Sequence, residues 1–105
     1  MGVSVSTQRR DQTVTVGVAG EIDLAAGAAV EAAIMAALAD QDVDTVVVDL
    51  TEVTFLDSSG ISVLLKARRA ADDRAVTYRA VGADGIVRKV LELTGVWPLL
   101  SGESG

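Results

Sequence analysis

Four consecutive residues, Asp57-Ser58-Ser59-Gly60, which we call the serine turn, lie between a hydrophobic strand-like segment and a helix-like segment. They combine a carboxylate, two hydroxyl groups and a residue without a side chain. One interpretation is structural: Asp57 caps the following helix by accepting a hydrogen bond from the backbone N–H of residue 59 or 60. The other is functional: Ser58, in the first turn of an exposed helix, carries a phosphate that is stabilised by free N–H groups and by the helix dipole.

A phosphate on this turn would act as a switch on protein binding. Phosphorylation adds about −1.5 to −2 charges, and burying such a charge without a partner costs several kcal/mol. A loss of roughly 2.7 to 4.1 kcal/mol already weakens binding about 100- to 1,000-fold. One phosphate on Ser58 is therefore enough to control an interface, and Ser59 is the second candidate for the modified residue.

Catalysis by the serine turn is the weaker interpretation. The chain contains no His and no Cys, which excludes a Ser-His-Asp triad, imidazole or thiolate metal sites and disulfides. Ser58 would need Lys66 or Lys89 as its base, and Lys66 lies roughly 240° around the helix from Gly60 at ~100° per residue. Neither a nucleophile elbow nor a phosphate-binding P-loop is present. We expect a binding domain that is not an enzyme, with no catalytic residue and no metal site.

Length and composition indicate one domain, spanning residues 1–105. The chain has 105 residues, half of them apolar, and a net charge of −6, which disfavours nucleic-acid binding and is otherwise an ordinary solubility device. The first ten residues lack the apolar region of a signal peptide. The longest apolar stretch, 24–39, is shorter than the roughly 20 residues of a membrane span. We expect a cytoplasmic protein that binds neither nucleic acid nor membrane.

Hydrophobic periodicity predicts the elements that position the serine turn. Alternating valines at 3–5 and 14–18 predict two strands joined by a hairpin turn at 9–12, the second ending at Gly20. An Ala-rich helix follows over 24–39, with its core residues at Val30, Ile34, Ala37 and Leu38. The β-branched run 44–50 is typical of a central parallel strand covered on both faces, and a short connection, 51–56, leads to the serine turn. A second helix is predicted over 58–71.

The remaining segments predict a fourth strand over 75–81 and a third helix over 84–93. In this helix Ile86, Val90 and Leu93 are expected to face inward, and Gly95 to follow its end. Residues 96–100 are expected to form a short strand or turn, and 101–105 a frayed tail. The fold class is α/β, with the order β-β-α-β-α-β-α and a mixed, mainly parallel sheet that starts with a hairpin.

Two further groups of residues border the serine turn. Ile61 and Leu65 lie off the centre of the core-facing side of the second helix, so they are either part of a wide buried stripe or apolar anchors for a partner. In the loop after the second strand, Asp23 either caps the Ala-rich helix or, with Glu21, presents carboxylates to a partner. The core-facing side of the second helix is predicted to contain Gly60, Val63, Leu64, Ala67, Ala70 and Ala71.

The chain resembles the STAS domain family, and within it the bacterial anti-sigma factor antagonists. The resemblance covers roughly residues 3–100, and its most specific part is the serine turn after Phe55-Leu56. It departs from many relatives at Ala25 and Ala26, and the loop 81–84 lacks the proline that some relatives have. The matching segments are 20–24, 46–50, 53–61 and 87–96.

That resemblance implies a partner-switching cycle. The unphosphorylated antagonist binds an anti-sigma factor that is also a serine kinase, which releases a sigma factor. The kinase phosphorylates the first serine after the aspartate, Ser58, and a phosphatase restores it. The ATP belongs to the kinase, so the chain itself needs no cofactor. The expected partner-binding residues are Glu21, Asp23, Asp57, Ser58, Ser59, Gly60, Ile61 and Leu65.

Two alternatives remain open at the level of sequence. One is a STAS adaptor subunit that docks on a transporter or on a larger stress-signalling assembly. The other is a small-molecule or nucleotide sensor that uses the N–H groups of the serine turn as an anion site, although the chain has no Gly-rich phosphate loop.

Overall fold

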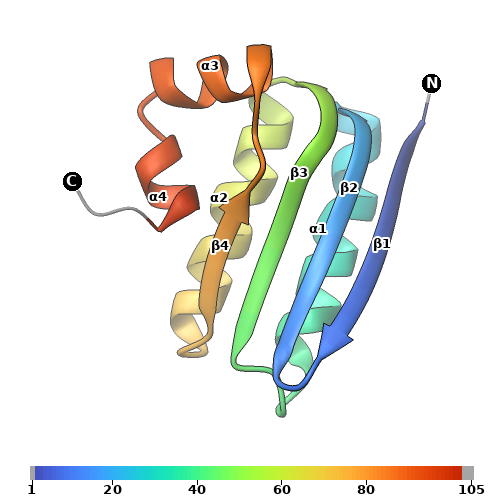
Figure 1. Ribbon diagram of the computed structural model, residues 1–105, viewed down its shortest axis with the longest axis vertical. Helices are drawn as coiled ribbons and strands as arrows, with labels where there is room; N and C mark the ends of the chain where they lie inside the picture. The colour runs from blue at the N-terminus through green and yellow to red at the C-terminus, as the bar shows by residue number, and fades with distance from the viewer. Residues whose placement is uncertain (1, 103–105) are drawn as a thin grey trace.

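A four-stranded sheet forms the centre of the computed structural model, which describes residues 2–102. The strands lie side by side in chain order, with an antiparallel hairpin at one edge and parallel pairing through the rest (Figure 1). This confirms the predicted mixed, mainly parallel sheet. The strands are β1 (Val3–Arg10), β2 (Thr13–Ile22), β3 (Thr45–Leu56) and β4 (Thr77–Val81).

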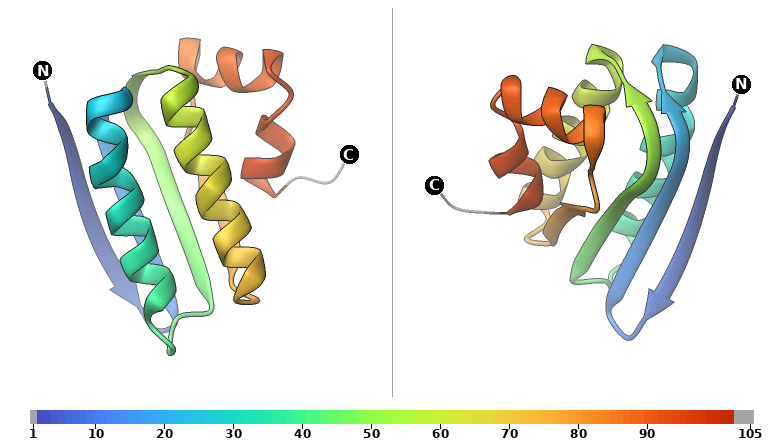
Figure 2. Two further views of the ribbon diagram at one scale, coloured as in Figure 1. Left: turned by 180° about the vertical axis from the view of Figure 1, so that it is seen from behind. Right: turned by 45° about the horizontal axis from the view of Figure 1, so that its top comes forward.

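Two long helices cover one face of the sheet and leave the other face open (Figure 2). Val46 and Val48 on β3 point into the core and are fully buried, whereas Val47 and Asp49, on the opposite face, are half-buried. The prediction that this strand is covered on both faces is therefore wrong, although its parallel pairing is confirmed. The helices are α1 (Leu24–Ala39), α2 (Ser58–Asp73), α3 (Gly85–Leu93) and α4 (Trp97–Ser101).

β2 and β3 extend further toward the serine turn than predicted. Two register irregularities, between Gly17 and Ala19 and between Gly20 and Glu21, let β2 continue past Gly20 to Ile22. β3 likewise runs through 51–56, which the sequence suggested was a connection. Each irregularity adds one residue on β3, and the bulged strand continues to pair with β2 beyond it. β2 therefore ends directly before Asp23, and β3 ends directly before Asp57.

Inward-facing positions of α3 differ from those predicted. Val87 and Leu91 are buried, Val90 is half-buried, and Ile86 and Leu93 are exposed. A shift of one residue turns a helix by about 100°, so the short apolar pattern of this segment selected the wrong face. Gly95 has φ 77, as expected of the residue after a helix end.

The segment 96–100 contributes to a short helix, α4, rather than to a strand or turn. Pro98 lies in its first turn, where a missing N–H costs nothing. Trp97 and Leu100 are buried, and the Arg88 guanidinium lies 4.4 Å from the centroid of the Trp97 ring. Of the predicted tail, Ser101 closes α4 and Gly102 follows it, whereas 103–105 lie outside the described residues.

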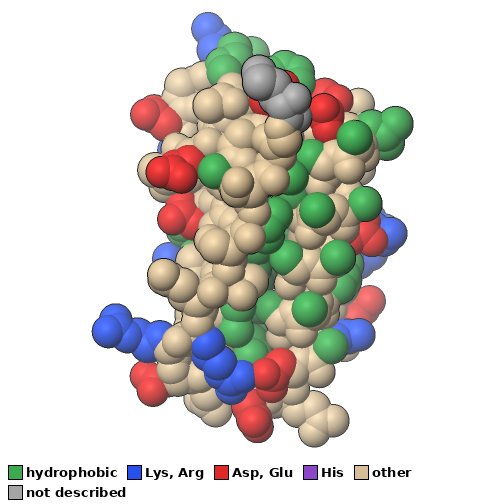
Figure 3. All heavy atoms as spheres, turned by 90° about the vertical axis from the view of Figure 1, so that its right-hand side faces the viewer, with side chains coloured by type: hydrophobic (Ala, Val, Ile, Leu, Met, Phe, Trp, Pro, Cys, Tyr) green, Lys and Arg blue, Asp and Glu red, His purple; other side chains and the backbone are tan. Residues whose placement is uncertain are grey.

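The outer side of α1 carries small apolar side chains. A space-filling view shows hydrophobic side chains over α1 and in the hollow between α1 and β1 (Figure 3). The predicted core residues of this helix, Val30, Ile34, Ala37 and Leu38, are all buried. Its exposed residues are Leu24, Ala25, Ala28, Ala29, Ala32, Ala36 and Ala39.

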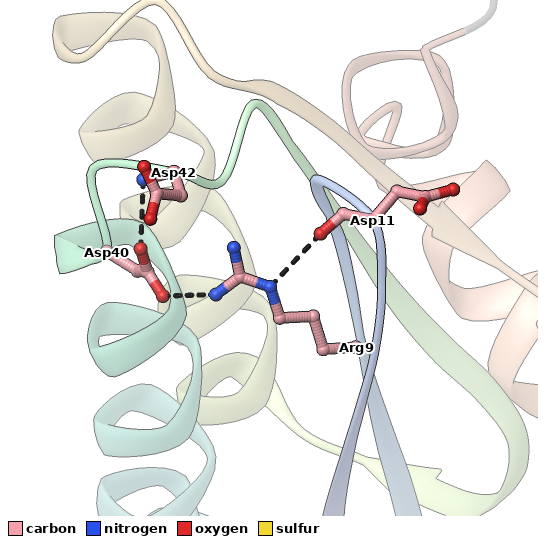
Figure 4. A network of polar contacts seen from close by, with 4 residues as sticks. All are labelled: Arg9, Asp11, Asp40 and Asp42. Carbon is pink, nitrogen blue, oxygen red and sulfur yellow. Dashed lines mark hydrogen bonds and ion pairs between the residues drawn. The ribbon is translucent and has the colours of Figure 1, made fainter.

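A small polar network ties the hairpin to the end of α1 (Figure 4). The hairpin turn itself is Asp11-Gln12, since Arg9 and Arg10 already pair within the sheet. Arg9 donates to the Asp11 carbonyl and to the carboxylate of Asp40, which follows α1. The backbone N–H of Asp42 and the Arg9 guanidinium lower the pKa of Asp40. These contacts lie at the opposite end of β2 from the serine turn.

Candidate functional site

The serine turn begins α2, and Asp57 is its N-cap. The Asp57 carboxylate accepts hydrogen bonds from the backbone N–H groups of Ser59 (2.9 Å) and Gly60 (3.1 Å). Its backbone is extended (φ −106, ψ −169), as the cap position requires. The capping interpretation of Asp57 is confirmed.

Ser58 is the first residue of α2, and its side chain faces solvent. Within residues 2–102 no hydrogen bond engages its hydroxyl, and Ser59 beside it is half-buried. The Asp57 cap already uses the N–H groups of Ser59 and Gly60. A phosphate on Ser58 would therefore be stabilised by the helix dipole rather than by those two N–H groups. The sequence had suggested that free N–H groups would contribute as well.

The loop between β2 and α1 lies directly beside the serine turn at the upper end of the sheet in Figure 1. The Asp57 N–H donates to the Ile22 carbonyl (3.4 Å), and Glu21 pairs with Phe55 across the parallel strands. Asp23 caps α1 and accepts from the Ala26 N–H (2.9 Å). Parallel strands end at the same edge of a sheet, so both caps come together there.

Gly60 is buried between the two loops. A Cβ at this position would lie 2.7 Å from the Ile22 carbonyl oxygen and 3.1 Å from the Leu56 Cβ. The absence of a side chain lets α2 approach the end of β2. Gly60 thus serves close packing of the helix on the sheet and presents no side chain to a partner.

Apolar residues around the serine turn fall into two groups. Ile61 and Leu65 are half-buried and pack against the core, so only part of each side chain is accessible. Leu24 and Phe55 are 79% and 47% exposed, and neither was predicted as a partner-binding residue. Leu24 directly follows the cap Asp23, and Phe55 lies two residues before the cap Asp57. A large apolar residue close to a polar cap is the signal that would have identified them.

The carboxylates at this end of the molecule carry no compensating charge. Within the described part of the chain, no ion pair joins Glu21, Asp23 or Asp57 to a basic residue. Lys66, further along α2, pairs with Glu31 of α1 at 3.1 Å. Over residues 2–102, no three His, Cys, Asp or Glu side chains converge as metal ligands. The site is therefore an exposed hydroxyl at a sheet edge that also carries unpaired carboxylates and two accessible apolar side chains.

Solved structures with the same fold include several anti-sigma factor antagonists, whereas no protein of curated function matches the sequence significantly. An anti-sigma factor antagonist from Mycobacterium paratuberculosis is 29% identical, with a TM-score of 0.80 over 90% of this chain and 80% of that chain. The unphosphorylated form of the anti-sigma factor antagonist SpoIIAA is 24% identical, with a TM-score of 0.70 over 86% and 83%. The phosphorylated form of SpoIIAA, a Bacillus cell fate determinant, is 25% identical, with a TM-score of 0.72 over 90% and 86%.

The same fold also occurs inside a membrane transporter. The murine anion transporter Slc26a9 matches at 21% identity with a TM-score of 0.73, covering 85% of this chain and 15% of that chain. No helix within residues 2–102 of the present chain is long and apolar enough to span a membrane.

A family model described as "Mlab, STAS domain" matches residues 5–101, and hence nearly every element described above. The hairpin from residue 5 onward, the parallel strands and all four helices fall within that match. The chain belongs to the STAS domain family.

Proposed function

We propose that this protein is an anti-sigma factor antagonist. In its unmodified form it binds an anti-sigma factor kinase in the cytoplasm and so releases a sigma factor. Phosphorylation of Ser58 ends the complex, and a phosphatase restores the binding form. The observation that carries the proposal is the exposed Ser58 hydroxyl at the start of α2, free of hydrogen bonds within residues 2–102.

Physical chemistry of the surroundings supports a switch at this position. Leu24 and Phe55, at the same edge of the sheet as Ser58, supply accessible apolar surface for a partner. A phosphate would add a dianion to a surface that already holds the carboxylates of Asp23 and Asp57. Covering this charge without a cation opposite it costs several kcal/mol. The protein needs no cofactor in this scheme, because the kinase supplies the ATP.

The similar solved structures support the same role. Two of them are anti-sigma factor antagonists, and SpoIIAA is known in both an unphosphorylated and a phosphorylated form. A domain of this fold therefore tolerates a phosphate. Ser58 is preferred over Ser59 because it is the more exposed of the two hydroxyls.

The test is phosphorylation by the cognate kinase, followed by a binding measurement. Intact mass and tandem spectra after incubation with kinase and ATP are expected to place one phosphate on Ser58, with Ser59→Ala as the matched control that remains a substrate. Ser58→Ala should keep kinase affinity, and Ser58→Glu should weaken it about tenfold or more. Phosphate at another residue, or equal affinity of all three proteins, would refute the switch.

A second candidate is a STAS adaptor on a transporter or a large stress-signalling assembly. The match to a segment of Slc26a9 favours it, since there the fold is one part of a transporter. Purification of the native protein distinguishes the two candidates. Recovery with a membrane complex or a megadalton assembly, and no kinase, would favour the adaptor.

A further inference from the structure

The two edges of the sheet differ in whether another segment of the chain lies beside them. β4 has five residues, and α4 lies beside it (Figure 1). β1 has eight residues, and its outer side is uncovered. Within residues 2–102, no backbone hydrogen bond joins that outer side to another segment. β1 thus presents a row of free N–H and C=O groups over most of its length.

β1 also lacks the devices that usually prevent edge strands from pairing. Such edges carry charged side chains, proline or a bulge. Residues 3–8 contain none of these, and the pairing of β1 with β2 runs without a register shift. The charges come only at the end of the strand, at Arg9 and Arg10, and Arg9 is held by Asp40.

The helix beside β1 is equally free of charge on its exposed side. Every exposed residue of α1 is alanine except Leu24, and hydrophobic side chains fill the hollow between α1 and β1 (Figure 3). On α2, by contrast, the exposed residues include Lys66, Arg69, Asp72 and Asp73. Because the chain carries a net charge of −6, two copies repel least where they meet along an uncharged side.

From these observations we infer that β1 pairs with β1 of a second copy of this chain. The strands run antiparallel about a two-fold axis perpendicular to the sheet, and the two four-stranded sheets join into one. This symmetry places both α1 helices on the same face, where alanine side chains leave room for a neighbouring helix. It also keeps the two Arg9-Arg10 pairs at opposite ends of the junction, whereas parallel pairing would bring them together.

The size of this surface predicts a weak dimer. β1 is about 26 Å long at 3.3 Å per residue, α1 is about 24 Å long, and the shortest dimension of the molecule is 20 Å. A contact of this length and depth buries on the order of 1,000–1,200 Å² in total, at the lower end of specific interfaces. We therefore expect a dimer whose population depends on protein concentration. This inference does not rest on the proposed function.

Sedimentation equilibrium over micromolar to millimolar concentrations tests the inference. The protein is expected to shift from monomer to dimer, and a monomer at all concentrations would overturn it. Ser6→Lys places two lysines near each other across the junction and should weaken the dimer tenfold or more. Its matched control, Thr77→Lys on the other edge strand, should leave dimerisation unchanged.

Two further measurements separate this interface from others. Ala32→Glu on the outer side of α1 should weaken the dimer, whereas Ser62→Glu on α2 should not, and circular dichroism checks that each variant is folded. Amide exchange of β1 should slow at every second residue as the dimer forms. A dimer that survives Ser6→Lys, or β1 exchange that is the same in monomer and dimer, would refute strand pairing and point to another surface or another partner.

Discussion

The N-termini of α1 and α2 are two versions of one local structure. Each helix follows a parallel strand and is capped by an aspartate, Asp23 (φ −105, ψ −171) or Asp57 (φ −106, ψ −169). The first turns differ in chemistry: α1 begins Leu24-Ala25-Ala26, and α2 begins Ser58-Ser59-Gly60. The backbone is the same, but one turn presents an apolar side chain and the other a hydroxyl.

This comparison separates capping from function. An aspartate cap starts both helices, so the cap alone does not identify a site of modification. Two features distinguish α2. Its first residue has an exposed hydroxyl, and the absence of a side chain at Gly60 lets its first turn pack closely against Ile22. The apolar start of α1 complements it, because Leu24 offers contact surface at the same edge of the sheet.

The largest expected effect is on stability, and it distinguishes the glycine near the start of α2 from the glycine near the start of α1. Gly60→Ala would place a Cβ 2.7 Å from the Ile22 carbonyl oxygen, whereas Gly27→Ala would meet only the Val63 Cγ2, at 3.2 Å. Overpacking against backbone should lower the free energy of unfolding of Gly60→Ala by about 2 kcal/mol. Gly27→Ala should remain within about 0.5 kcal/mol of the parent, since alanine favours the helix. Urea unfolding of both variants measures this, and equal stabilities would contradict the packing argument.

Removal of the exposed apolar side chains should affect binding and not folding. Phe55→Ala and Leu24→Ala should each weaken kinase binding by about 1–2 kcal/mol, or roughly 5- to 30-fold. Isothermal titration calorimetry measures the affinities, and Leu93→Ala, an exposed apolar residue at the end of α3, serves as the control. Unchanged affinity in both variants would place the partner elsewhere.

The two caps should differ modestly in strength. Asp57 accepts two backbone N–H groups and Asp23 accepts one. Loss of an N-cap side chain costs about 1 kcal/mol, so Asp57→Ala should destabilise the protein by about that amount and Asp23→Ala by less. Thermal and urea unfolding compare them, and a larger loss for Asp23→Ala would reverse the ranking.

The smallest effect on phosphorylation is expected when serines are introduced at the start of α1. Leu24→Ser with Ala25→Ser gives α1 the first-turn chemistry of α2 on the same cap. We expect the kinase to leave the new serines unmodified and to phosphorylate Ser58 as before, because the partner recognises its surroundings as well as the turn. Tandem mass spectrometry decides this. Phosphate at residue 24 would mean that a capped serine is sufficient.

Much of the fold was predictable because its signals are local. Val14, Val16 and Val18 alternate with smaller or polar residues, and one face of β2 is buried as that pattern requires. The capping aspartates, the Ala-rich helix and the hairpin depend on neighbours in sequence. The wrong face of α3 and the helix at 97–101 arose where segments are short and contacts with distant elements decide the outcome.

Sequence alone determined that the serine turn starts a helix after a strand, and that the chain lacks His and Cys chemistry. Only the tertiary structure decided that Gly60 is buried against Ile22, and that Leu24 and Phe55 stand exposed at the same edge of the sheet as Ser58. It also decided that one sheet face and the edge of β1 stay uncovered. The physical reason is that capping depends on residues within one turn, whereas exposure depends on which strands end together and on what lies across from them.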